Sequence, residues 1–300
     1  MVLNASGPWA KWLLAEQTKD PDALLSRGNR HLFIVPWRDF NLVGVWHVVH
    51  KGRPETFTVT EADLQGVIDE LNVSYPAAEL TLDDVTMWNA GLTLFGENKP
   101  GAIDLSYGKR SIIIDHAHDH QVEGLISLIG VRYTTARGIA EKAMKLVFQK
   151  LGQPAPAAKT AVTPLHGGEF DNFDRMLNEA NRVRPSTLPA EIMPALLQNY
   201  GTAYKDVLDY AAQQPELAEP IGDSTVLKAE IGHAVREEMA QKLSDVVFRR
   251  TDLGTGQHPG EAALQTCARL MAAELGWDER RVQQELDEVR ALFPMLRGEP

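Results

Sequence analysis

The spacing of apolar residues predicts a strand that runs directly into a helix near the middle of the chain. Residues 124–129 form a short apolar run with the length of a buried strand. Farther on, apolar side chains recur at helical spacing until Gly152 and Pro154 stop the pattern; they are Ile139, Ala140, Ala143, Val147 and Leu151. Residues 130–137 are therefore expected to form the turn that leads into this helix.

Residues 31–50 predict a β-hairpin. Two extended segments, 31–37 and 42–50, flank a polar turn at 38–41. Two other stretches, 85–88 and 110–114, are also expected to be extended.

A helix is predicted after residue 60. Thr60 and Asp63 have the spacing of a capping box, and the apolar residues that follow share one helical face, at Leu64, Val67, Ile68 and Leu71. Strands combined with one crossing helix indicate an α+β domain in this half of the chain.

The pattern changes after residue 152. Residues 153–188 are rich in Pro, Ala, Thr and Gly and are interpreted as a linker with a short helix near 170–180. Residues 189–300 have helical patterns, including one stripe formed by Leu227, Ile231, Val235, Met239 and Leu243. The sequence therefore predicts an all-α carboxyl-terminal domain.

Start and stop signals support the last two predicted helices. Pro259 stands near the start of one helix and Gly276 at its end. Asp278 is placed to cap the next helix, with Trp277 and Val282 as a hydrophobic staple.

Composition limits the class of protein. The 300 residues carry a formal net charge of −11, which argues against nucleic acid as a partner. The single cysteine, Cys267, excludes an internal disulfide and a cysteine-based metal cluster, and its apolar neighbours predict that it is buried. No signal peptide and no apolar run long enough to cross a bilayer is present, so a cytoplasmic location is expected.

The predicted helix N-terminus near residue 134 is a candidate anion site. Its unpaired N–H groups carry roughly half a positive charge, which stabilises a group that becomes anionic during a reaction. Many strand-to-helix turns have only a packing role, so this local pattern does not define a function.

Several sequence blocks resemble the FAD-dependent (aerobic) glycerol-3-phosphate dehydrogenases. The blocks keep that family's order across nearly the whole chain, at residues 4–9 (NASGPW), 33–37 (FIVPW), 130–137 (GVRYTTAR), 234–240 (AVREEMA) and 248–254 (FRRTDLG). The last two blocks are the most specific.

The resemblance implies a domain order. Residues 1–20 would be a remnant of the FAD-binding domain and residues 21–152 a mostly antiparallel substrate or cap domain that ends in the flavin-facing helix. No Gly-x-Gly-x-x-Gly turn, which would hold the FAD pyrophosphate, occurs in the chain. We therefore expect the carboxyl-terminal part of such an enzyme, starting at an internal Met or a mispredicted start.

The resemblance also implies site residues. FAD would lie against Gly7, Pro8, Trp9, Gly130, Val131, Arg132, Tyr133 and Thr134. Arg132 occupies the position of the family's lysine; it keeps the charge but is a poor proton acceptor. Arg110 matches a substrate-pocket arginine that would bind phosphate, although a solvated strand end is an equally simple interpretation.

Two departures leave the substrate open. The family's Gly-Thr-Thr-Asp is replaced by residues 44–47 (GVWH), and its Gly-x-Arg-Pro-Leu by residues 91–94 (GLTL), which removes a pocket arginine. His47 could accept the proton of a substrate hydroxyl, although a packed strand histidine is the simpler interpretation.

The run Asp115-His116-Ala117-His118-Asp119-His120 suggests a metal site at first sight. If the run were a strand, its three histidines would share one face. The family places a variable hairpin turn here, so a polar turn is expected and no metal is predicted.

The resemblance implies hydride transfer from glycerol 3-phosphate, or a related 2-hydroxy substrate, to FAD. A quinone acceptor with peripheral membrane contact at the inner face is expected from the family, and homo-oligomer formation stays open. Dehydrogenase and oxidase are not separated by the sequence. The alternative is a non-enzymatic truncated remnant that acts as a helical interaction module.

Overall fold

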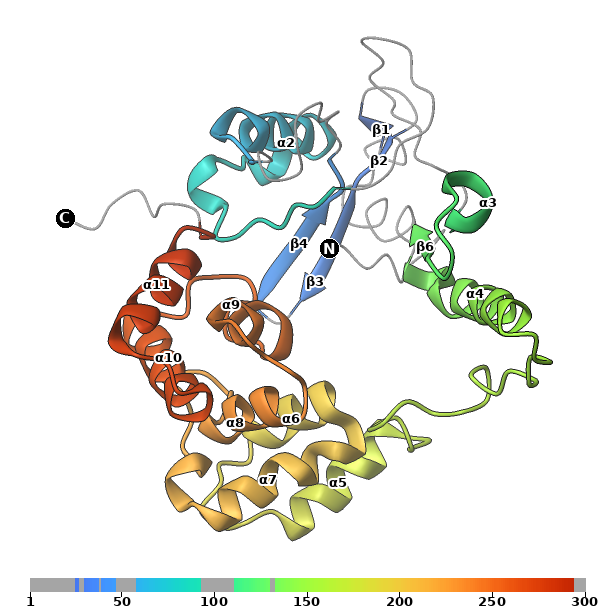
Figure 1. Cartoon of the computed structure of the whole chain (residues 1–300). Helices are drawn as coiled ribbons and strands as arrows, with labels where there is room; N and C mark the ends of the chain where they lie inside the picture. The colour runs from blue at the N-terminus through green and yellow to red at the C-terminus, as the bar shows by residue number, and fades with distance from the viewer. Residues whose placement is uncertain are drawn as a thin grey trace. The chain divides into compact units, whose positions relative to one another are not determined.

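The computed structural model describes residues 25–26, 30–37, 39–46, 58–92, 111–129 and 133–293 of the chain (Figure 1). They form two compact units: the first ends at Val162, and the second comprises residues 86–88 and the chain from Thr163 onward. The first unit carries antiparallel strand pairs with a few helices, and the second is helical. This arrangement confirms the predicted α+β class. The predicted boundaries at residues 20, 152 and 188 stay predictions.

Three antiparallel strand pairs lie in the described part of the first unit. They join β1 (Leu25–Ser26) to β2 (Arg30–His31), β3 (Phe33–Trp37) to β4 (Phe40–Gly44), and β5 (Ile112–Asp115) to β6 (Ile126–Ile129). Each pair is a separate two-stranded sheet.

The predicted hairpin is confirmed from β3 through β4. Trp37 pairs with Phe40, so the turn is shorter than the predicted turn at 38–41. The strand β4 ends at Gly44, and residues 47–50 of the prediction lie outside the described residues.

Helix α2 (Glu61–Ser74) begins as predicted. The Asp63 amide donates to the Thr60 hydroxyl at 3.2 Å, and the Thr60 amide donates to the Asp63 carboxylate at 2.9 Å, which completes the capping box. Ile68 and Leu71 are buried on its inner face. Two 3₁₀ turns follow, η3 (Pro76–Ala78) and η4 (Leu82–Asp84).

The stretch 85–88, predicted to be extended, pairs with no strand in the described structure, although the backbone of Val85 is extended. The Thr86 hydroxyl donates to the Gly256 carbonyl within the second unit. Periodicity alone cannot distinguish a short apolar stretch of this length from a strand.

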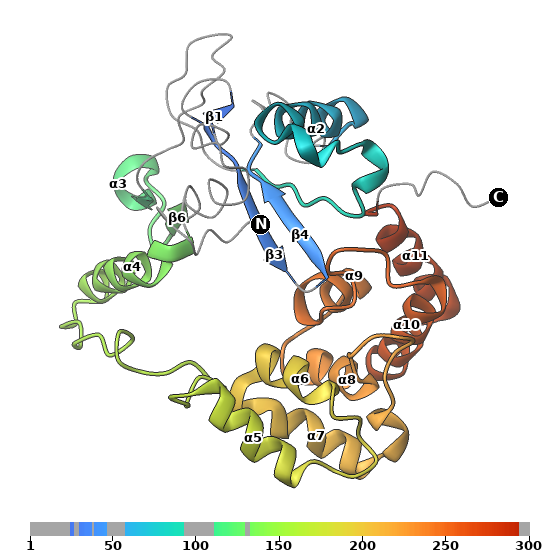
Figure 2. The same ribbon diagram turned by 180° about the vertical axis from the view of Figure 1, so that it is seen from behind.

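The strand-to-helix prediction is confirmed. Between β5 and β6 stands α3 (His116–His120), and after β6 the 3₁₀ turn η5 (Tyr133–Thr135) leads into α4 (Ala136–Lys150), which Figure 2 shows from behind. The polar segment at residues 115–120 lies where the antiparallel strands β5 and β6 are joined, as the predicted hairpin turn requires. A single helical turn forms there because the Asp115 carboxylate accepts the Ala117 amide at 3.1 Å and so caps it.

The second unit consists of helices joined by short turns. In chain order they are α5 (Phe173–Val183), α6 (Ile192–Tyr200), η6 (Gly201–Ala203), α7 (Tyr204–Gln213), η7 (Pro215–Ala218), α8 (Lys228–Arg236), α9 (Leu243–Asp245), the π-helix η8 (Val246–Arg250), α10 (Glu261–Leu275) and α11 (Glu279–Arg290). Helix α5 confirms the short helix predicted near residues 170–180.

The predicted signals at the last two helices are confirmed. Gly276 ends α10 in the left-handed conformation, with φ of 68°, and the Asp278 carboxylate accepts the Arg281 amide at 2.8 Å to cap α11. Trp277 and Val282 both pack against one cluster of buried side chains.

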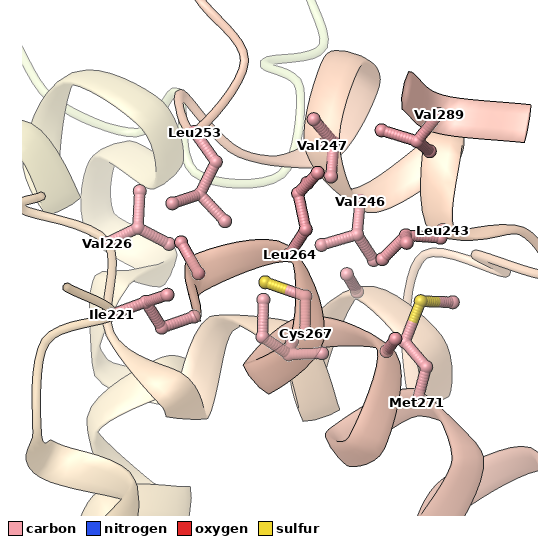
Figure 3. Close-up of a cluster of buried hydrophobic side chains, with 14 of the residues drawn as sticks. Ile221, Val226, Leu243, Val246, Val247, Leu253, Leu264, Cys267, Met271 and Val289 are labelled. Atoms are coloured by element: carbon pink, nitrogen blue, oxygen red, sulfur yellow. The ribbon is translucent and has the colours of Figure 1, made fainter. Parts of the chain in front are cut away.

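Two clusters of buried apolar side chains hold the second unit together. The first lies between α8, α9, η8, α10 and α11, and Figure 3 shows Leu264, Cys267 and Met271 of α10 within it. Cys267 is fully buried, as predicted, and burial raises the pKa of its thiol to about 12. The second cluster joins α5, α6 and α7 to the start of α8.

The predicted stripe from Leu227 to Leu243 is wrong at Met239. Helix α8 ends at Arg236, and Met239 is 80% exposed with φ of 58°. The Ala240 amide donates to the Ala234 carbonyl at 2.9 Å, which closes the turn that contains Met239. The spacing of apolar residues continues beyond the end of α8, because Leu243, the first residue of α9, is buried in the same cluster as Ile231.

The helical unit is expected to need the residues before 189. Met176 and Ala180 of α5 are buried in the second cluster, so a fragment of residues 163–300 should melt cooperatively, and a fragment of residues 189–300 should melt at a lower temperature. Burial of one such methionine stabilises by roughly 1.5–3 kcal/mol. Circular dichroism with thermal melting measures both fragments. Equal melting temperatures would show that α5 adds nothing, and a non-cooperative melt of both would contradict an independent unit.

Candidate functional site

The N-terminus of α4 is the described part of the predicted flavin site. Tyr133 is 83% exposed, and Thr134 and the first residues of α4 are also exposed. The first turn of α4 contains no acidic residue, and the N-cap residue Thr135 makes no side-chain capping bond. An exposed helix start without a carboxylate suits an anionic group that accepts its N–H bonds.

An ion pair fixes the other end of α4. The Lys150 ammonium donates to both carboxylate oxygens of Asp115 at 2.9 Å, and this hydrogen bond lowers the pKa of the Asp115 carboxyl. Asp115 ends β5, and the neighbouring His116 shares a 2.8 Å hydrogen bond with Ser127 of β6. Helix α4 is therefore tied to the strand pair that precedes it.

The strand pair and α4 expose apolar side chains. Between one third and two thirds of each side chain is accessible at Ile112, Val122, Leu125, Leu128, Met144 and Leu151. Only Ala143 of α4 is buried. Exposed apolar surface of this kind is typical of an element that packs against a further segment.

Most of the predicted site residues lie outside the described residues. They are Gly7, Pro8, Trp9, His47, Arg110, Gly130, Val131 and Arg132. Tyr133 and Thr134 lie in η5 at the start of α4, as the sequence predicts. The structure therefore brings together the helix and two of its predicted flavin contacts, and the roles of the other residues stay predictions.

Residues 44–47, one of the two segments that differ from the family's pattern, include a residue with a packing role in the described structure. Trp46, which follows β4, lies against α2, because a Cβ added at Gly66 would be 3.3 Å from its indole ring. The absence of a side chain at Gly66 makes room for the indole. The sequence from 44 to 47 thus serves packing at Trp46, next to the candidate base His47.

A buried polar pair in the second unit was missed by the sequence analysis. The Tyr200 hydroxyl donates to Glu230 at 3.0 Å, and the other Glu230 oxygen accepts the Leu227 amide at 2.8 Å. Glu230 is 1% exposed, and burial raises the pKa of its carboxyl to about 7. Its position at the third residue of α8 is a capping signal, but the contact with Tyr200 joins residues that are far apart in sequence.

The described fold defines an α+β chain with a helical carboxyl-terminal unit. Residues 158–282 match the family described as the C-terminal domain of alpha-glycerophosphate oxidase. This match covers most of the second unit.

Proteins named glycerol-3-phosphate dehydrogenase are similar to this chain over most of its length. A glycerol-3-phosphate dehydrogenase of Synechocystis sp. is 30% identical over 262 residues, which are 86% of this chain and 46% of the relative. A probable mitochondrial glycerol-3-phosphate dehydrogenase of Dictyostelium discoideum is 27% identical over 287 residues, which are 93% of this chain and 42% of the relative. The resemblance predicted from the sequence blocks is thereby confirmed, and the chain spans about half the length of these curated relatives.

A solved structure has the same fold. The glycerol-3-phosphate dehydrogenase from Bacillus halodurans, crystallised with FAD, aligns with a TM-score of 0.70 at 24% identity, over 89% of this chain and 52% of that one. None of the helices in the described residues is long and apolar enough to span a membrane.

Proposed function

We propose that this chain is the carboxyl-terminal part of a flavin-dependent oxidoreductase that oxidises glycerol 3-phosphate or a related 2-hydroxy substrate. The observation that supports this proposal best is the exposed start of α4. It has no acidic residue in its first turn, and it occurs at the flavin-facing block of a chain that is similar to glycerol-3-phosphate dehydrogenases.

The start of α4 fits the flavin by charge and by access. Its N–H groups carry the positive end of the helix dipole, which favours the anionic edge of a reduced flavin. Tyr133 and Thr134 stand beside this helix start and are both exposed, so they can contact the ring. When bound, FAD supplies the hydride acceptor, and the protein supplies orientation and charge.

The substrate roles rest on the resemblance. Arg132 would add positive charge next to the flavin, and Arg110 would bind the substrate phosphate through two parallel hydrogen bonds. His47 would accept the proton of the substrate hydroxyl while the carbon that bears this hydroxyl gives its hydride to the flavin. Residues 91–94 lack the family's arginine, so binding of glycerol 3-phosphate should be weaker than in the family or shifted to another 2-hydroxy compound.

The exposed side chains of β6 and α4 support a surface that a further segment completes. We expect this segment to carry the pyrophosphate-binding turn that the chain lacks. A quinone acceptor reached through peripheral membrane contact at the inner face, and a cytoplasmic location, remain part of the proposal.

FAD titration tests the cofactor part of the proposal. The chain alone should not bind FAD at one molecule per chain, because the glycine-rich turn is missing from its sequence. The chain joined to the amino-terminal half of the Synechocystis relative should bind one FAD and show the absorbance band of a flavoprotein. Stoichiometric FAD in the chain alone would contradict the missing-segment account. A joined protein that melts cooperatively without binding FAD would favour the non-enzymatic remnant.

A further inference from the structure

A polar hollow of about 540 Å³ lies in the second unit. The end of α6, the residues after α8, and η8 with the turn that follows it form the lining. Every lining side chain carries a hydrogen-bonding group, and Arg249, Arg250 and Glu238 are among them. A volume of this size is within the range of small-molecule sites.

Unusual backbone shapes two walls of the hollow. Arg249 and Arg250 belong to the π-helix η8, in which the Thr251 amide donates to the Val246 carbonyl at 3.1 Å. Isolated π-helical turns are rare and occur frequently at functional sites. Glu238 lies just before the left-handed residue Met239. The Glu238 backbone carbonyl accepts the Arg250 Nε–H at 3.2 Å.

Hydrogen-bonding capacity remains unused on both sides of the hollow. Among the described residues, the Arg249 side chain bonds only through Nη1, to Ser244 and Asp245, so Nε and Nη2 are available. Across the described chain, the Glu238 carboxylate accepts no hydrogen bond: its Oε2 is buried 3.7 Å from Arg250 Nε, while 33% of the side chain stays exposed. An exposed carboxylate oxygen can accept an O–H or N–H donor.

The charges of the hollow are already balanced. Arg250 lies 3.7 Å from Glu238, Arg249 lies 3.2 Å from Asp245, and Asp252 accepts the Asn199 amide at 3.1 Å. A phosphate would meet Glu238 and Asp252, and an ammonium group would meet the two arginines, so each ion would face a like charge. A hydroxyl both donates and accepts, and therefore suits a carboxylate and a guanidinium at once.

We propose that this hollow binds a neutral polyol, with Arg249 and Glu238 holding adjacent hydroxyl groups. Arg249 donates to one hydroxyl oxygen through its unused N–H groups, and a neighbouring hydroxyl donates to the carboxylate of Glu238. The residues that line the hollow are not among those proposed to contact the flavin, and the test does not depend on FAD.

Nuclear magnetic resonance of the ¹⁵N-labelled full chain tests the proposal, with glycerol, ribitol and inorganic phosphate as probes. Glycerol or ribitol should shift the amide signals of residues 198–200, 238 and 249–252 in a saturable manner. Loss of hydrogen bonds from a charged group should weaken the affinity roughly tenfold in Arg249→Gln and in Glu238→Gln. Arg269→Gln, an exposed change on α10, is the matched control and should leave the titration unchanged.

Several outcomes would overturn the proposal. Saturable shifts with phosphate alone would define an anion site. Shifts that grow linearly or spread over the whole unit would indicate a general solvent effect of the polyol. Equal affinities in Arg249→Gln, Glu238→Gln and Arg269→Gln, each with a wild-type spectrum, would place binding elsewhere.

Discussion

Replacing Gly201 by alanine is expected to destabilise the helical unit by at least about 3 kcal/mol, because a Cβ has no space there. A Cβ at Gly201 would overlap the Gly167 carbonyl oxygen, and a Cβ at Gly167 would overlap the Tyr200 carbonyl oxygen. The Thr202 amide donates to that Gly167 oxygen at 2.9 Å. The two backbones therefore cross in direct contact, and neither can move away without losing this hydrogen bond.

The control is another glycine with left-handed backbone. Gly276 has φ of 68°, close to the 55° of Gly201, but nothing lies within 4 Å of its Cβ position. Gly276→Ala should lower the free energy of unfolding by roughly 1 kcal/mol, because only the left-handed backbone disfavours alanine there. Urea unfolding of the fragment of residues 163–300, followed through the fluorescence of its single tryptophan, Trp277, measures both variants. Similar losses in the two variants would refute the close crossing.

The free energy of unfolding of the wild type is expected to decline between pH 5 and pH 8. The Glu230→Gln variant should lack much of this decline. Burial raises the pKa of Glu230 from its ordinary 4.5 to about 7 in the folded chain. The stabilising effect of the bound proton is fully present below pH 4.5 and is lost as the pH rises through 7. The difference corresponds to about 3 kcal/mol by pH 8.

Paired unfolding measurements isolate this effect. The free energy of unfolding of the wild type minus that of Glu230→Gln should fall with rising pH, because every other titrating group is common to both proteins. Glutamine keeps one oxygen, which can accept from Leu227 or Tyr200. A difference that stays constant from pH 5 to pH 8 would mean that Glu230 is not protonated in the folded chain.

Local sequence signals predicted much of the fold. The capping box at Thr60, the stop at Gly276 and the cap at Asp278 each depend on residues a few positions apart, and all three are confirmed. The hairpin of β3 and β4 depends on a short polar turn between two apolar runs, and it is confirmed apart from a shorter turn.

The features that sequence did not predict depend on contacts between distant residues. The Tyr200 hydroxyl reaches Glu230 across two helices, and Gly167 meets Gly201 through backbone packing alone. The break of α8 at Met239 is hidden by an apolar spacing that continues on both sides. At the candidate site, the strand and helix were predicted correctly, and the roles of Arg132, Arg110 and His47 rest on resemblance.

Anaerobic flavin reduction tests the central proposal most directly. The chain is joined to the amino-terminal half of the Synechocystis relative, loaded with FAD and mixed with glycerol 3-phosphate in a stopped-flow instrument. The flavin absorbance should bleach. Arg132→Ala should slow the bleaching while the melting temperature stays unchanged. Arg132→Lys keeps the positive charge without the planar guanidinium, and therefore shows which of the two the reaction needs. A folded, FAD-loaded protein whose flavin stays oxidised with glycerol 3-phosphate and with related 2-hydroxy compounds would contradict the account.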